Sequence, residues 1–188
     1  MIKPVLATLA AAVSLLALTA CNPMEPGAAA IVGPTRISEQ QLADEVEAIL
    51  QAQGQPTDQA DAGLTSAVLG RLVVIELVRQ AAAKAGVSIT QGDIDTTVDA
   101  YVKEAGGEQQ FQQLFVQQNI APSQITSIIV LNLQAQALGR VLLPNGDPQA
   151  QGAQLRSTLG AFSVEQGTTI SPRYGTWEPD GLAIGLLT

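Results

Sequence analysis

The chain has 188 residues, nine basic and seventeen acidic side chains, one cysteine and no histidine, so its formal net charge at pH 7 is −8. A chain without histidine lacks Ser-His-Asp and Cys-His catalytic sets and the usual zinc site, and an acidic chain binds nucleic acid poorly because Lys and Arg supply most of that affinity. No Walker-type or G-x-G-x-x-G loop is present. We expect no enzyme activity, no cofactor, no metal and no nucleic-acid partner.

Residues 1–20 are typical of a secretory signal peptide, because Lys3 is followed by an uncharged apolar stretch. That stretch is shorter than the roughly 20 apolar residues of a membrane span. It ends in Leu18-Thr19-Ala20-Cys21, which resembles the lipobox of bacterial lipoproteins and implies a diacylglyceryl group on Cys21. The alternative is an ordinary signal peptide beside a chance cysteine. Against it, Cys21 has no second cysteine to pair with, and a free thiol is unusual in an exported protein.

We therefore expect an exported protein whose lipid anchors it to the outer face of the cytoplasmic membrane. The acidic mature chain argues against electrostatic docking onto anionic lipids, so the lipid does the anchoring. Residues 21–28 would form the lipidated cysteine and a tether containing proline and glycine. Residues 29–177 suit one domain, and residues 178–188 have no periodic pattern and predict an irregular tail.

The first expected elements are a strand and two helices. The apolar run Ala28–Val32 predicts a short strand. Ser38 with Gln41 is a capping-box signature for a helix with one apolar stripe: Leu42, Val46, Ile49 and Leu50. The longest helix is expected from about Gln59 to Ala85, with Gly86 as its C-terminal cap. Its apolar residues cover much of its circumference, so we expect it at the centre of a bundle.

Two helices of different length follow. Thr90 opens the first, with Asp93 placed to reach back to the cap, and its stripe is expected to be buried: Ile94, Val98, Tyr101, Val102 and Ala105. A cation site is an alternative role for Asp93, Asp95 and Asp99. We interpret them instead as solvent-facing residues near a helix N-terminus, where negative charge is favoured. After Gly106-Gly107, a short helix is expected to carry three apolar residues on one side: Phe111, Leu114 and Phe115.

Two more helices and a strand complete the expected fold. Pro122 suits the first position of a long helix that ends before Pro144. Asp147 predicts the cap of a last helix with Leu155, Leu159 and Phe162 on one face. Residues 168–171 predict a second short strand. The expected fold class is all-α: a helical bundle of about six helices, with a two-stranded β patch joining the N- and C-terminal segments.

Three motifs, found in this order, carry a family resemblance. They are Val87-Ser88-Ile89-Thr90 before an acidic helix start, the Phe111 to Ile125 pattern, and Ser171-Pro172-Arg173-Tyr174-Gly175-Thr176-Trp177. Together they resemble the N-terminal chaperone domain of the SurA family of periplasmic folding factors and its PrsA-like relatives, and the last is similar to an ending of actinobacterial lipoproteins of this type. Two departures are Asn119-Ile120 in place of a glycine step and Ser171 in place of Asn. The resemblance covers roughly residues 29–177.

The resemblance implies a chaperone-like domain that binds unfolded proteins. Relatives with prolyl isomerase activity insert a histidine-containing parvulin domain after the long helix, but here residues 145–167 are too short a segment for one. We therefore expect the part that binds other proteins, called clients below, without isomerase activity.

Two functions fit these features. The first is a holdase that covers apolar segments of newly exported proteins, with six candidate client-binding residues: Tyr101, Phe111, Leu114, Phe115, Arg173 and Trp177. The alternative for the apolar ones is a place in the core, since aromatic residues are scarce here, and for Arg173 an ion pair with a carboxylate of the bundle. The second function is an adaptor or assembly lipoprotein with one dedicated partner in the cell envelope.

Overall fold

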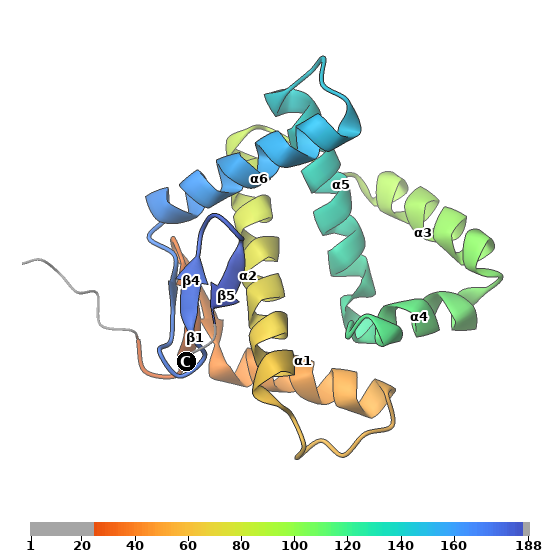
Figure 1. The fold of residues 1–188 in the computed structure, drawn as a ribbon. Helices are drawn as coiled ribbons and strands as arrows, with labels where there is room; N and C mark the ends of the chain where they lie inside the picture. Colours follow the sequence, from red (N-terminus) through yellow and green to blue (C-terminus); the bar gives the residue numbers. More distant parts are fainter. Residues whose placement is uncertain (1–24, 186–188) are drawn as a thin grey trace, which may run out of the picture.

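The computed structural model describes residues 25–185, and their fold is mostly helical (Figure 1). The helices are α1 Glu39–Ala52, α2 Ala62–Lys84, α3 Gln91–Ala105, α4 Glu108–Gln117, α5 Ile125–Leu142 and α6 Pro148–Glu165, with a 3-10 turn, η1 Pro122–Gln124, before α5. The strands are β1 Ala28–Val32, β2 Thr35–Ser38, β3 Thr169–Ile170, β4 Thr176–Glu178 and β5 Ala183–Gly185. The predicted fold class, a six-helix domain with a small β patch, is confirmed.

Two small antiparallel sheets lie beside the helices. In the first, β1 is the middle strand between β2 and β3, so the predicted pairing of the N- and C-terminal segments is present. The β2 strand and the β4–β5 hairpin were not predicted. The hairpin pairs Trp177 with Ile184, and therefore part of the expected irregular tail is a strand. Ala28, expected in the tether, is a buried residue of β1.

The main core surrounds α2, as the spread of its apolar residues predicts. Leu69, Val73 and Leu77 have no exposed surface, and α2 contacts α1, α5, α6 and the strands β1, β2 and β5. The helix begins three residues later than expected, because the side chain of Asp61 accepts a hydrogen bond from the Leu64 amide at 2.6 Å and caps it.

Local helix signals are reproduced closely. The Ser38 side chain accepts from the Gln41 amide, Thr90 and Asp93 form a reciprocal capping box, and the Asp147 side chain caps α6. Asp93, Asp95 and Asp99 are exposed, as expected for solvent-facing residues of α3.

An arm formed by α3 and α4 projects from the body of the molecule and meets it along α5 (Figure 1). Within residues 25–185, the segment Pro122–Leu142 is the one helix long and apolar enough to cross a membrane. It nevertheless packs against α2 and α6, and it also contacts α3 of the arm. Only 28 % of its most apolar stretch is buried, so much of its apolar surface lies on half-open faces.

Candidate functional site

A second group of packed apolar side chains, which we call the arm cluster, lies where α3 and α4 meet the first half of α5. Its buried members are Phe111, Ile120, Ile125, Ile128 and Ile129. Partly buried side chains pack around them: Ile75, Ile94, Val98, Val102, Ala105, Phe115, Leu131 and Leu133. The cluster is thus an apolar core with an incompletely covered rim.

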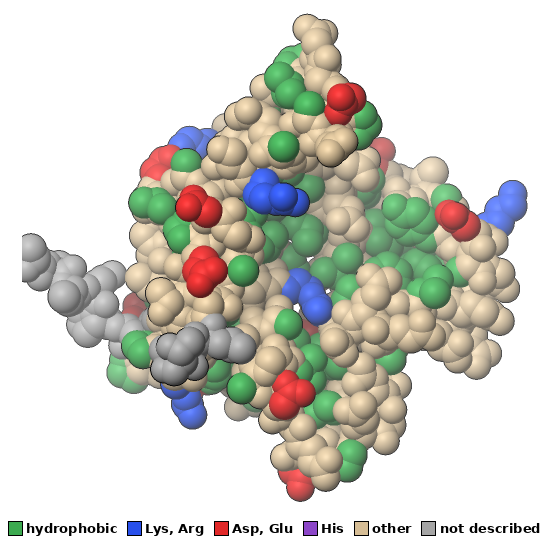
Figure 2. All heavy atoms as spheres, in the orientation of Figure 1, with side chains coloured by type: hydrophobic (Ala, Val, Ile, Leu, Met, Phe, Trp, Pro, Cys, Tyr) green, Lys and Arg blue, Asp and Glu red, His purple; other side chains and the backbone are tan. Residues whose placement is uncertain are grey.

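The α3 helix accounts for much of that open rim. Its apolar residues recur at helical spacing, yet none of its fifteen residues is buried, so the expectation of a buried stripe is wrong. The physical reason is that α3 packs against α4 and α5, and these two helices do not enclose its apolar face. Figure 2 shows apolar side chains gathered over the arm and α5, around the hollow between the arm and α2.

Four of the six predicted client-binding residues lie on the arm, and two of them, Phe111 and Phe115, are in contact. Phe111 is 3 % exposed and packs edge-to-face against Phe115, with ring centroids 5.1 Å apart. Phe115 is half-buried, whereas Tyr101 and Leu114 are 39 % and 48 % exposed. Phe111 therefore belongs to the interior of the arm, and the other three side chains reach its surface. Leu114 does not share the buried side of α4, contrary to the expected stripe.

The other two candidates lie outside the arm. Trp177 is 9 % exposed in the main core, and its indole Nε1 donates to the Ser163 Oγ at 3.0 Å. Arg173 is exposed and pairs with Glu39 at 2.9 Å, which is the alternative that the sequence left open. The loop-like residues around Trp177 gave no sign of its burial, because its partner lies on α6.

A group of polar side chains, which we call the polar latch, connects the base of the arm to α1 and α2; it consists of Glu45, Gln53, Arg71, Asn119 and Gln124. Arg71 Nη1 donates to the backbone oxygen of Asn119 at 2.6 Å, and Gln53 Nε2 donates to the Asn119 Oδ1 at 2.8 Å. Asn119 has a φ of +57°, a left-handed conformation that asparagine tolerates better than most residues. This explains how Asn119 stands in for the expected glycine. Beside it, the Gln124 side chain donates to the Glu45 carboxylate.

Burial shifts both charged groups of the latch toward their neutral forms. It raises the pKa of Glu45, against the opposing effects of the Arg71 charge and the Gln124 hydrogen bond. It lowers the pKa of Arg71, and the Glu45 charge opposes that shift. Each of the two charges therefore partly offsets the pKa shift that burial causes in the other group.

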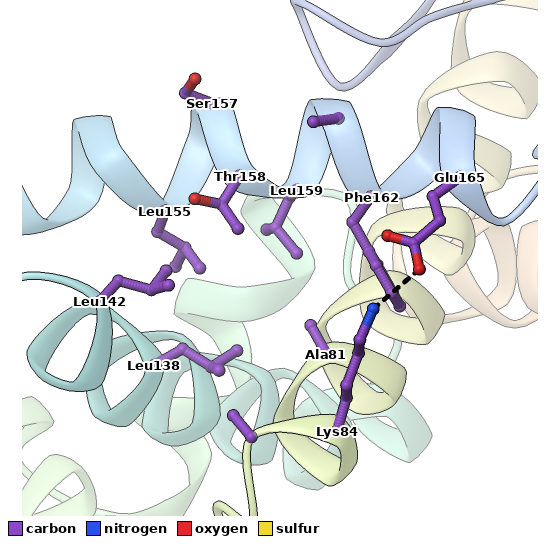
Figure 3. A pocket seen from close by; sticks show the side chains of 12 residues that line it. Ala81, Lys84, Leu138, Leu142, Leu155, Ser157, Thr158, Leu159, Phe162 and Glu165 are labelled. Carbon is purple, nitrogen blue, oxygen red and sulfur yellow. Dashed lines mark hydrogen bonds and ion pairs between the residues drawn. The ribbon is translucent and has the colours of Figure 1, made fainter.

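A separate apolar groove of about 490 Å³ lies where α6 crosses α5 and the C-terminal end of α2 (Figure 3). Leu138 and Leu142 of α5 lie opposite Leu155 and Leu159 of α6. At one end Lys84 forms an ion pair with Glu165 at 2.8 Å and lies 5.2 Å from the centre of the Phe162 ring. The sequence gave no sign of this groove, because one of its walls comes from α2, which is distant along the chain from α5 and α6.

The comparisons with known proteins bear on the class of this fold. The chain matches the family model described as SurA-like N-terminal domain over residues 1–138. That range is more than half of the chain, and this protein therefore belongs to the SurA-like N-terminal domain family, whose domains are of chaperone type and not catalytic. No curated protein and no solved structure matches the chain significantly.

The family match confirms the resemblance to the SurA N-terminal domain, and it includes the first two of the three motifs but not the one at residues 171–177. It includes the arm and most of α5, and ends at Leu138. Between α5 and β3, where isomerase relatives carry a parvulin domain, this structure has α6.

Proposed function

We propose that this protein is a holdase: a membrane-anchored, extracytoplasmic chaperone that binds apolar segments of unfolded exported proteins on its arm cluster, without prolyl isomerase activity. The observation that carries the proposal is the half-open apolar rim of the arm, above all the α3 helix with an apolar stripe and no buried residue. A contiguous apolar surface left open on a folded domain is characteristic of interaction sites.

The chemistry of the arm suits clients of unrelated sequence. Apolar contact is non-directional and grows with the area removed from water, at about 25 cal/mol per Å². Tyr101 on α3 and Leu114 on α4 add exposed aromatic and aliphatic surface to the same arm. Contacts of this kind accept many segments and release them readily, as a holdase requires.

The anchor in this proposal is a lipid on Cys21, which lies outside the described residues. The description begins at Glu25, four residues later. A chain spans at most roughly 3.6 Å per residue, so this tether would hold Glu25 within about 14 Å of the membrane surface. The domain would therefore work close to the membrane, where exported segments emerge.

The anchor is tested by expressing the full chain and its Cys21→Ala variant in a bacterial host. The wild type is expected in the detergent-rich phase of a two-phase extraction, with an N-terminal peptide heavier by the mass of the lipid. The variant is expected in the aqueous phase. A wild-type protein that partitions into water with an unmodified cysteine would refute the anchor.

The holdase activity is tested by adding residues 22–188, in stoichiometric amounts, to several unrelated proteins as they unfold, while light scattering reports aggregation. Suppression is expected for most of them. A Tyr101→Ser/Leu114→Ser variant should lose much of it, because exposed apolar surface is removed from the arm. The matched control is Val164→Ser, which changes a 65 % exposed apolar residue on α6, outside the arm. No suppression of any client would refute the holdase and favour the adaptor with one partner at fixed stoichiometry.

A further inference from the structure

The arm carries a large share of the chain's negative charge. Residues 85–121, which include α3 and α4, contain one basic side chain, Lys103, and five acidic ones: Asp93, Asp95, Asp99, Glu104 and Glu108. Their net charge is −4, half of the −8 of the whole chain. The half-open apolar surface therefore lies in one of two strongly acidic segments of the fold, the other being residues 39–61, which contain six acidic side chains and no basic one.

None of these five carboxylates forms an ion pair within residues 25–185. The four ion pairs of this part of the chain all join residues outside the arm. The carboxylates that have side-chain partners accept hydrogen bonds from uncharged groups. Asp95 accepts from the Gln91 amide and Glu108 from the Gln112 amide, both at 2.7 Å. The negative charge of the arm is consequently available to a partner.

Helical spacing places these charges around the apolar stripe. Asp95 and Asp99 each follow a stripe residue by one position, while Glu104 lies three residues after Tyr101 and hence beside it on the helix surface. Lys103 likewise follows the stripe residue Val102 by one position and lies four residues after Asp99, so it shares the flank of Asp95 and Asp99, whereas Glu104 lies on the other flank of the stripe. At the base of the arm, the Arg71 guanidinium donates to the Asn119 backbone oxygen.

We propose that the arm cluster selects apolar client segments that carry Lys or Arg close to their apolar residues, over acidic segments of equal apolarity. This inference rests on the proposed function, and names the class of client. Opposite charges beside an apolar contact attract the partner and steer its approach, whereas like charges placed against each other suppress binding. The α5–α6 groove sets no such preference, because its one cation and one anion, Lys84 and Glu165, pair with each other.

The test uses two fluorescent peptides with the same apolar sequence, one flanked by lysines and one by glutamates. Their binding to residues 22–188 is followed by fluorescence anisotropy at low ionic strength. Each exposed charge pair is expected to change affinity by a factor of roughly 1.5 to 5. With two pairs, the lysine peptide should bind about threefold to twentyfold more tightly. The preference should nearly vanish at about 1 M salt, where the screening length is roughly 3 Å.

Two variants locate the effect. Asp99→Asn/Glu104→Gln should remove most of the preference while leaving the apolar contact in place. The control Asp58→Asn/Asp180→Asn removes the same charge outside the arm and should keep the preference. Equal affinity for both peptides, or a preference that both variants keep, would overturn this inference. It would also fall if sedimentation velocity showed a dimer that excludes peptide from the arm, because a second copy would then be the occupant. Binding of neither peptide would refute the proposed function itself.

Discussion

One buried carboxylate, Glu76, joins the β1–β2 hairpin to the central helix. Its side chain is 11 % exposed and accepts hydrogen bonds from Thr35 Oγ1 at 2.6 Å, Arg79 Nε at 2.7 Å and Gln80 Nε2 at 2.6 Å. Gln80 Nε2 also donates to the Val32 backbone oxygen at 2.9 Å. Replacing Glu76 by Gln keeps the shape of the side chain but removes its charge and one acceptor oxygen.

We expect this substitution to lower the free energy of unfolding by about 2 kcal/mol at pH 7. A hydrogen bond to a charged group contributes roughly 1.5–3 kcal/mol, and an unsatisfied buried partner costs a similar amount. The Arg79 hydrogen bonds contribute little to this loss of unfolding free energy, because the Arg79 side chain is 54 % exposed and water replaces its partner. Thr35 and Gln80 both donate to Oε1, so the amide oxygen of the variant can take that position, and the loss comes mainly from the weaker, uncharged acceptor that these two groups then share.

The effect depends on pH with a definite sign. Burial by itself raises the pKa of Glu76, but the hydrogen bonds from Arg79, Gln80 and Thr35 outweigh it and hold the pKa below its ordinary value of 4.5. A group whose pKa is lower in the folded state stabilises the fold fully above its unfolded pKa, and that contribution disappears as pH falls through the folded pKa. The difference between wild type and Glu76→Gln should shrink steadily below about pH 4.

Urea denaturation followed by tryptophan fluorescence measures this difference, since Trp177 is the one tryptophan of the chain and is buried. The matched control is Glu47→Gln, an exposed carboxylate on α1 that accepts from Gln51 alone, and it should change stability by less than about 0.5 kcal/mol. Equal midpoints for wild type and Glu76→Gln at pH 7, or a difference as large at pH 3 as at pH 7, would show that the Glu76 charge does not stabilise the fold in this way.

Three further substitutions test the packing. Gly160→Ala should cost about 1–3 kcal/mol in thermal unfolding, because a Cβ there would lie 2.7 Å from the Pro179 backbone oxygen; unchanged stability would contradict this contact. Phe111→Ala should cost about 3–5 kcal/mol and speed hydrogen exchange in α3 and α4 more than in α2; a uniform increase would argue against a separate arm cluster. Ser163→Ala leaves the Trp177 Nε1 without its acceptor and should cost about 1–3 kcal/mol in urea, with a shifted emission maximum; an unchanged spectrum would count against the hydrogen bond.

Features set by local chemistry were predictable from the sequence. The caps at Ser38, Thr90 and Asp147 are hydrogen bonds across three residues, so residue identity and spacing define them. The central place of α2 was also predictable, because a helix apolar around most of its circumference must be covered on several sides.

Features set by distant contacts were not predictable. Periodicity shows which residues of α3 share a face, but no pattern within α3 tells whether another element covers that face. The β4–β5 hairpin has strands of three residues, too short for an alternating pattern, and it packs on α2. The Arg71–Asn119 contact joins residues 48 positions apart, so only the folded chain brings this part of the latch together.

Whether each candidate client-binding residue is exposed or buried also depends on contacts with distant parts of the chain. Tyr101, Phe115 and Leu114 reach the arm surface because the arm has few neighbours, whereas Trp177 is buried by α6, which precedes it in the chain. A proline- and glycine-containing segment such as the one before Trp177 predicts irregular backbone but not exposure.

The most direct test of the arm as the client-binding surface is to map where an unfolded client contacts the protein. A photoreactive amino acid is placed at Leu114 on the arm or at Val164 on α6, two exposed apolar positions of similar character. Each variant is then irradiated with a chemically unfolded client. We expect cross-links from position 114 that excess unlabelled client competes away, and few from position 164. Equal cross-linking at both positions, or stronger cross-linking at 164, would contradict the arm as the client-binding surface.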